Sequence, residues 1–224
     1  KPQRRGENLD PVHRAAMNEA FEEYCRFGGY PAVALAETSR ADRRLLESLV
    51  DVYVRRDLRD LMLVENPAGM LRLLRHLSAI TAQLLNQSSV SNTVNLSRPT
   101  VSKYLFSLEQ SFIVRTLSPY FTNRVTEQTK MPKVHFLDPG LRNHLLADDR
   151  PLDLRPDMGA LVETFVFDQL IRESPEARLH FWRTKAGAEV DFVLLREGLP
   201  IPIEVKFQRM RQPEVSSGLR SCIA

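Results

Sequence analysis

Residues 178–207 constrain the fold of this 224-residue chain most, because their apolar side chains recur at every second position. Such a period predicts β-strands, in which successive side chains point to opposite faces. The apolar face is formed by Val190, Phe192 and Leu194, then by Ile201, Ile203, Val205 and Phe207. The intervening residues 196–199 include a glycine and predict a tight turn. The segment is therefore expected to form a hairpin with one buried face.

The opposite face of this hairpin carries carboxylates and a lysine. If the turn is centred between the strands, opposed residue numbers sum to 395, so that Asp191 faces Glu204 and Glu189 faces Lys206. Opposed Cβ atoms lie about 4.5–5.5 Å apart. Two facing anions repel unless a cation or proton lies between them, and Mg²⁺ prefers oxygen ligands. Asp191 and Glu204 are thus expected to hold a metal ion, with Lys206 orienting water or neutralising phosphate.

A second interpretation of the same pattern is an amphipathic hairpin whose outer face is merely charged. In that case Glu189 and Lys206 form a cross-strand ion pair, which is common among exposed strand residues. A turn shifted by one residue would weaken the pairing of Asp191 with Glu204. It would still leave Glu204 and Lys206 on one face.

The hairpin residues also carry a resemblance to known proteins. Asp191 followed by Glu204-Val205-Lys206 resembles the Asp…Glu-x-Lys signature of the PD-(D/E)XK nuclease superfamily, and Glu163 lies on a preceding helix where that family often has an acidic residue. The whole chain is similar to the C-terminal half of a bacterial and archaeal AAA+-like ATPase family whose tail is called DUF4143. The motifs that carry this resemblance are FGGYP, SRPTVSKYL, PYFTNR, KVHFLDPGL, GALVETFVFDQL, FWRTKAGAEVDFVL and PIEVK.

The resemblance implies an α+β protein of three units: a helical ATPase-lid segment at 1–66, a winged helix at 67–150, and a restriction-endonuclease-like αβββ core at 151–224. The family fold continues beyond Glu-x-Lys, so this core is expected to be incomplete. The resemblance implies Mg²⁺ or Mn²⁺ held by Glu163, Asp191 and Glu204, with Asp191, Glu204 and Lys206 as catalytic residues. Because the chain has no Walker A pattern, ATP is expected to bind only to an ATPase core upstream of Lys1.

Glu163 lies near the apolar face of its predicted helix, where a charge needs a partner. A metal shared with Asp191 and Glu204 is one candidate. Arg183 or Lys185 is the other.

Residues 70–137 are predicted to form a winged helix. Apolar residues at helical spacing run from Met70 to Leu85, a short helix covers 90–94, and Ser97 is expected to cap a helix that extends to about Ser111. The N-terminal half of that last helix, which reads the major groove in helix-turn-helix proteins, contains Arg98, Thr100, Ser102 and Lys103. Residues 112–120 and 133–137 are expected to form the wing. Arg124, Lys130 and Lys133 lie in or beside its connecting loop.

Charge favours DNA as the partner of this unit. Residues 97–133 carry six basic and two acidic side chains, whereas the whole chain has a net charge of only +3. A local basic excess is typical of a phosphate contact. The alternative is that the unit packs an ATPase core against its tail and contacts no DNA.

Composition excludes several classes. A hydrophobic content of 43% with 26% charged residues is typical of a globular protein, and no apolar run is long enough to span a membrane. Two distant cysteines predict reduced thiols and a cytoplasmic location. The five histidines are scattered, which argues against a zinc site or a Ser-His-Asp triad.

Two hypotheses of different class remain. The first is a Mg²⁺-dependent DNA nuclease module that is directed by the winged helix and coupled to an ATPase. The second is a non-catalytic tail for DNA binding or self-association, with a degenerate nuclease fold whose charges form structural pairs.

Overall fold

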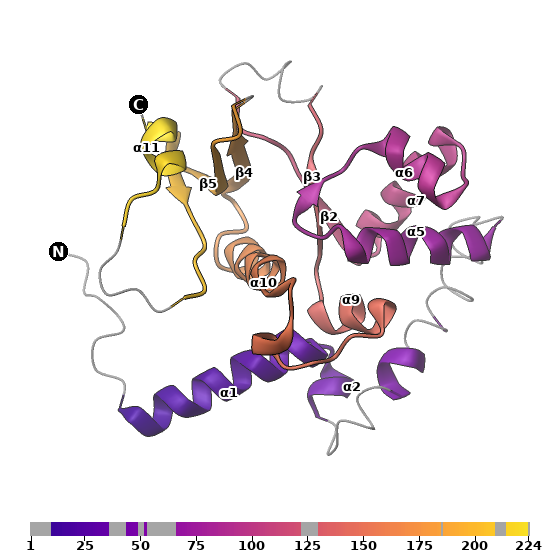
Figure 1. Cartoon of the computed structure of the whole chain (residues 1–224), viewed down its shortest axis with the longest axis horizontal. Helices are drawn as coiled ribbons and strands as arrows, with labels where there is room; N and C mark the ends of the chain where they lie inside the picture. The colour runs from indigo at the N-terminus through magenta and orange to yellow at the C-terminus, as the bar shows by residue number, and fades with distance from the viewer. Residues whose placement is uncertain are drawn as a thin grey trace.

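The computed structural model describes residues 10–35, 44–48, 52, 66–121, 130–184, 186–208 and 214–223. These residues form a mixed structure in which helices surround two small three-stranded antiparallel sheets, as expected for the α+β class. The first sheet lies beside the helices α5, α6 and α7, and the second lies above α10 (Figure 1).

The N-terminal helix α1 (Pro11–Phe27) begins at Asp10, whose carboxylate accepts hydrogen bonds from the Val12 and His13 amides. It ends at Gly28, whose positive φ of 84° suits glycine. The short helix α2 (Pro31–Ala34) follows, and residues 44–48 are also helical. The paired glycines of the FGGYP motif thus mark the end of α1.

The next elements are α5 (Pro67–Ala79), β1 (Gln83–Leu84), α6 (Gln87–Val94), α7 (Arg98–Gln110), β2 (Val114–Leu117) and β3 (Lys133–Phe136). The single long helix predicted to extend to Leu85 is wrong, because α5 stops at Ala79. The chain turns at Ala82, which has a φ of 62°, and its amide donates to the Val134 carbonyl at 2.7 Å. Pairing with β3 therefore replaces the last helical turn.

The turn between α6 and α7 agrees with the sequence. Asn95 ends α6 in the left-handed conformation, and the Ser97 hydroxyl accepts a hydrogen bond from the Thr100 amide at 3.2 Å. Ser97 is therefore the N-cap of α7, as predicted. Pro99 lies in the first turn, where a missing N–H is harmless.

The pairing predicted between residues 112–120 and 133–137 is also confirmed. Val114 faces Phe136, and Leu117 faces Lys133, in an antiparallel ladder. The strand order in this sheet is β1-β3-β2, so β3 is central. All four β3 residues are buried.

Helix α9 (Pro139–Leu146) packs against α1 through two of the sequence motifs. The Asp138 carboxylate caps α9 by accepting a hydrogen bond from the Leu141 amide at 2.8 Å. It also accepts a hydrogen bond from the Gly29 amide at 2.8 Å. A Cβ at Gly140 would lie 1.9 Å from the Phe27 carbonyl oxygen, so only glycine fits there. The FGGYP and LDPGL segments are therefore held together by this hydrogen bond to Gly29 and by the close contact of Gly140 with Phe27.

A 3₁₀ turn, η2 (Leu152–Leu154), leads to α10 (Met158–Glu173) and to the second sheet. That sheet contains β4 (Arg178–Arg183), β5 (Glu189–Arg196) and β6 (Leu199–Ile203) in the order β4-β5-β6. Phe192 faces Ile203 and Arg196 faces Leu199, so the predicted sum of 395 is confirmed. The turn residues Glu197 and Gly198 have φ values of 54° and 81°.

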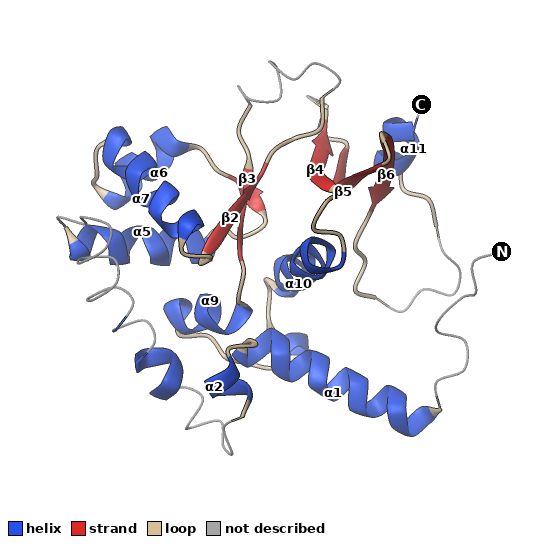
Figure 2. Cartoon of the chain, turned by 180° about the vertical axis from the view of Figure 1, so that it is seen from behind, coloured by secondary structure: helices blue, strands red, loops and turns tan. Residues whose placement is uncertain are grey.

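Two details of the hairpin differ from the prediction. Strand β6 ends at Ile203, so Glu204 and Lys206 follow the strand instead of lying within it. Val193, which alternation along the strand places on the same face as Asp191, is fully buried. Helix α11 (Ser217–Ile223) packs against β5 and β6, as Figure 2 shows from behind. This helix covers part of the second sheet.

The described residues form three buried hydrophobic clusters. The largest joins α5, α6, α7, β2 and β3, with residues such as Leu73, Val101 and Phe136. A second joins β2, α10 and the second sheet through Leu117, Phe167, Phe181 and Phe192. A third surrounds Cys25, which burial gives a pKa of about 12. Helix α10 therefore contacts elements from both halves of the chain.

Candidate functional site

A cluster of charged side chains surrounds Lys133, the first residue of β3. Its ammonium lies 2.8 Å from a Glu163 carboxylate oxygen on α10 and 2.6 Å from a Glu189 oxygen on β5. The Lys133 side chain is only 3% exposed. Arg183 lies 3.5 Å from the second oxygen of Glu189. One lysine from the first sheet therefore binds carboxylates from two elements of the second unit.

The predicted hairpin residues lie beside this lysine. One Asp191 carboxylate oxygen accepts a hydrogen bond from the Val205 amide at 2.8 Å, which brings Asp191 next to the segment that contains Glu204. The Lys206 ammonium lies 2.6 Å from one oxygen of Glu204, and the Ser216 hydroxyl donates to the other. The lysine cluster, defined as Lys133, Glu163, Glu189, Asp191, Glu204 and Lys206, thus includes every residue predicted for the catalytic and metal roles.

The carboxylates of the lysine cluster differ in their ionisation. Burial raises the pKa of Glu163 to about 7 despite the opposing pull of Lys133, and repulsion by Asp191 and Glu189 adds to the rise. Burial also raises the pKa of Asp191. The pKa of Glu204 is lowered because Lys206 and Ser216 outweigh its burial. Burial alone would lower the pKa of Lys133, but Glu163 and Glu189 raise it, so the ammonium stays charged.

The residues as placed do not fit a divalent metal ion. In the described part of the chain, no group of three or more His, Cys, Asp and Glu side chains is arranged to hold one. Glu163 and Glu189 bind an ammonium, and Glu204 binds another. Mg²⁺ would need about six oxygen ligands near 2.1 Å. In this structure the partner of Glu163 is Lys133, whereas Arg183 pairs with Glu189. Lys185 lies outside the described residues.

The predicted DNA-binding residues lie on a separate surface. Arg98, Ser102, Lys103 and Phe106 are exposed along one side of α7, opposite the buried Val101, Tyr104, Leu105 and Leu108. The Thr100 hydroxyl lies 2.7 Å from that of Ser97, and the Ser102 hydroxyl donates to Gln87 on α6 at 2.9 Å. Lys130 is exposed, and Arg124 lies outside the described residues.

Lys133 is a correction to the predicted DNA surface. Its side chain is buried and both of its ion pairs are internal, so it does not reach solvent where a phosphate could bind. Lys133 was predicted to contact DNA because it adjoins the basic loop in the sequence. The decisive contacts come from α10 and β5, which lie far along the chain.

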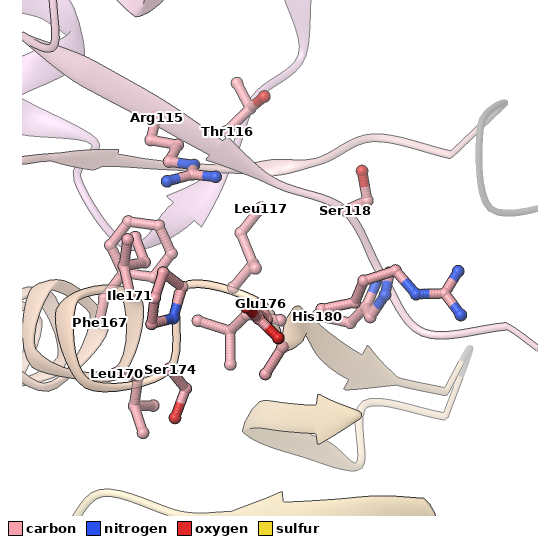
Figure 3. Close-up of a pocket in the computed structure, with 14 residues that line it drawn as sticks. Arg115, Thr116, Leu117, Ser118, Phe167, Leu170, Ile171, Ser174, Glu176 and His180 are labelled. Atoms are coloured by element: carbon pink, nitrogen blue, oxygen red, sulfur yellow. The ribbon is translucent and has the colours of Figure 1, made fainter. Parts of the chain in front are cut away.

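A separate cavity of about 430 Å³ lies between β2, the end of α10 and the start of β4. Figure 3 shows Arg115 and Thr116 on β2 and His180 on β4 at its walls. Beyond the cavity, the Phe181 amide donates to the Ser118 carbonyl and joins the two sheets. None of the predicted catalytic residues lines this cavity.

Two family models match successive parts of the chain. Residues 18–152 match the family model described as a domain of unknown function, DUF8612. The chain belongs to the DUF8612 family. Residues 158–223 match a second model, the domain of unknown function DUF4143, as the sequence motifs indicated. The DUF8612 region spans both units predicted at 1–66 and 67–150, whose division stays a prediction.

Curated relatives of this DUF8612 protein are uncharacterized. Proteins of Mycobacterium tuberculosis and Mycobacterium bovis are each 30% identical over 198 residues, covering 88% of this chain and 44% of theirs. A Haemophilus influenzae protein is 25% identical over 206 residues, covering 90% of this chain and 49% of its own. The chain thus spans about half the length of these relatives. No solved structure matches it.

The family boundaries show what the lysine cluster connects. Lys133 belongs to the DUF8612 region, whereas Glu163, Glu189, Asp191 and Glu204 belong to the DUF4143 region. Sequence reasoning missed this connection, although a signal was present. In KVHF, Lys133 and His135 share one face of the strand, and Glu163 and Phe167 share one face of α10. His135 stacks on Phe167 at 4.2 Å, which places Lys133 against Glu163.

None of the helices described in the structure combines the length and apolar composition that a membrane crossing requires.

Proposed function

We propose that this chain is the DNA-binding portion of a larger AAA+-like ATPase, and that α7 is the recognition helix of a winged helix. The observation that carries the proposal is the exposed side of α7. Arg98 and Lys103 lie there in the N-terminal half of a helix that follows a short helix and a tight turn. In helix-turn-helix proteins this part of the second helix enters the major groove.

The surrounding elements support the same proposal. The order α5, β1, α6, α7, β2, β3 and the sheet order β1-β3-β2 are those expected of a winged helix. Lys130 is exposed just before β3 and would lie at the wing. Basic side chains at these places would neutralise phosphates and release counterions.

DNA binding is tested by fluorescence anisotropy with a labelled duplex and the whole chain. The double substitution Arg98→Ala/Lys103→Ala is expected to weaken binding at least tenfold. It should also reduce the slope of log affinity against log salt by about 2, because two phosphate contacts are lost. Arg178→Ala/Arg196→Ala removes the same charge from exposed positions on β4 and β5 and is the matched control. Equal weakening by both double variants would point to general charge attraction and reject α7 as the contact.

Metal-dependent cleavage of DNA is the second candidate function. It is favoured by the closeness of Asp191 to both Glu163 and Glu204. The Asp191 carboxylate repels each of these two carboxylates. The test is cleavage of plasmid and single-stranded DNA with Mg²⁺ or Mn²⁺, using Glu204→Ala and Lys206→Ala as controls. Cleavage that both substitutions abolish would support this candidate. No cleavage, or cleavage that survives them, would reject it.

Binding of ATP is proposed only for a part of the protein outside this chain. The curated relatives are about twice as long, which leaves room for an ATPase core. In that arrangement the helices of the DUF8612 region would transmit its movements to the DNA-binding surface.

A further inference from the structure

A cavity of about 590 Å³, called the junction cavity, lies where distant segments of the chain meet. Its walls come from the α1–α2 junction, from the turn after α7 with the start of β2, from the residues before α9, and from α10. Its volume is within the range of small-molecule sites, roughly 300–1,000 Å³. None of the predicted catalytic, metal or DNA-binding residues lines it.

The two carboxylates on the walls of the junction cavity are not equally available. Both oxygens of Asp138 already accept hydrogen bonds from backbone amides. The Asp168 side chain is only 6% exposed. The Arg172 guanidinium at 2.7 Å and the Tyr24 hydroxyl at 3.1 Å both donate to its Oδ2 atom. Among the described residues, none donates a hydrogen bond to its Oδ1 atom, so this oxygen is the acceptor left for a ligand.

Arg115 on β2 supplies a cation to the same cavity. Its side chain is exposed and forms no ion pair within the part of the chain that the structure describes. Figure 3 shows it on the side of β2 that faces α10, beside the neighbouring cavity, which shares Arg115 and Ile171 with this one. A guanidinium binds a carboxylate through two parallel hydrogen bonds. With Asp138, Asp168 and Arg172, the charges of the lining balance, so a ligand that carries one charge of each sign fits better than a simple anion or cation.

Aromatic rings form the apolar part of the cavity. Tyr24, Tyr30 and Phe112 all line it. Phe112 follows the end of α7 with a φ of 57°, a left-handed position at which glycine is usual and a bulky residue is strained. Its ring is 77% exposed, so burial does not offset this strain. Strained residues are concentrated at ligand sites, and a flat apolar group packed on Phe112 would cover its ring.

We propose that the junction cavity binds a small zwitterion with an aromatic body, the chemistry of a free aromatic amino acid. Its carboxylate pairs with the Arg115 guanidinium, its ammonium donates to the Asp168 Oδ1 atom, and its ring packs against Phe112. The ligand would contact both α10 and segments of the DUF8612 region, and would hold them together. This site is independent of DNA binding.

The first test compares three probes that share one ring, by saturation-transfer NMR and calorimetry with the whole chain. L-phenylalanine carries both charges, phenylpropionate lacks the ammonium, and phenylethylamine lacks the carboxylate. L-phenylalanine is expected to bind at least about tenfold more tightly than either, because each of the others leaves a charged group of the wall without a partner. Equal binding of either single-charge probe, or no saturation transfer to L-phenylalanine, would overturn the proposal.

The second test assigns each charge of the ligand to its partner. Arg115→Met should weaken L-phenylalanine at least about tenfold but change phenylethylamine by less than about twofold, because the amine does not use the guanidinium. Asp168→Asn should weaken L-phenylalanine by a similar factor and leave phenylpropionate unchanged. Arg196→Met, which removes an exposed guanidinium at the end of β5, is the matched control and should have no effect.

Equal losses in the Arg115 and Arg196 variants would reject the site. Asp168 also binds Tyr24 and Arg172, so its variant is first checked for folding by circular dichroism. If it does not fold, the three probes and the exposed Arg115 and Arg196 variants still decide the result.

Discussion

Two groups of buried charges join α10 to the DUF8612 region, and they are built differently. The arginine cluster is defined as Arg142, Arg155, Asp157 and Asp148. The buried guanidiniums of Arg142 and Arg155 both bind the Asp157 carboxylate, and the Arg155 Nη2 atom lies 2.9 Å from its Oδ2 atom. Hydrogen bonds from Arg155 and Arg142 outweigh burial and lower the pKa of Asp157. In the lysine cluster, burial instead raises the pKa of both Glu163 and Asp191.

The difference separates a structural group from a candidate functional one. In the arginine cluster, two basic and two acidic side chains match each other, so ionisation favours the folded state. In the lysine cluster, four carboxylates face the buried Lys133, the exposed Lys206 and the Arg183 guanidinium. Burial raises the pKa of Glu163, so its ionisation opposes folding. Carboxylates with raised pKa values are concentrated at functional sites, although structural networks also produce them.

The largest expected effect is on the arginine cluster. Asp157→Asn should lower the free energy of unfolding by about 3–5 kcal/mol, because it leaves two buried guanidiniums short of an anion. The loss should be constant from pH 8 to pH 5.5. Asp157 has a lowered pKa, so its contribution disappears only as the pH falls below its ordinary value near 4. Urea unfolding at both pH values measures it.

Asp153→Asn is the control, since Asp153 is exposed a few residues earlier, and it should change stability by less than about 0.5 kcal/mol. An Asp157→Asn loss below about 1 kcal/mol would show that the arginine cluster is not structural.

A smaller effect, which depends on pH, is expected in the lysine cluster. Lys133→Met should cost about 2–3 kcal/mol at pH 8, where Glu163 and Glu189 are left without a buried cation. The cost should shrink towards pH 5.5, because protonation of carboxylates with raised pKa values removes the repulsion. The measurement is urea unfolding of the variant and wild type at each pH. A loss as insensitive to pH as that of Asp157→Asn would mean that the two clusters behave alike.

The smallest effect concerns Glu163 itself. Its folded-state pKa of about 7 exceeds its ordinary value near 4.3, so the folded protein keeps a proton that the unfolded chain releases between these values. Wild-type stability should therefore fall as the pH rises from about 4.5 to 7. Glu163→Gln should flatten this profile by about 1–2 kcal/mol. Glu173→Gln, at an exposed position on the same helix, should leave the profile unchanged.

Local features were predictable because short-range geometry decides them. The hairpin register follows from a two-residue turn at Glu197 and Gly198, and the start of α7 follows from the Ser97 cap. The prediction that Glu163 needs a partner was also correct, since an anion on an apolar helix face cannot stay unpaired. Each of these depends on residues within a few positions of one another.

The tertiary structure alone decided which cation meets those carboxylates. From the sequence, Lys133 belonged to a basic loop and Glu163 to a metal site, because charge counts and motifs describe neighbours along the chain. Packing of β3 against α10 placed Lys133 2.8 Å from Glu163 on α10 and 2.6 Å from Glu189 on β5, and closed it off from solvent. The sequence by itself determined the strands, the turn and the carboxylates. Folding determined their partner, because burial forces each charge to pair with whichever opposite charge is brought nearest.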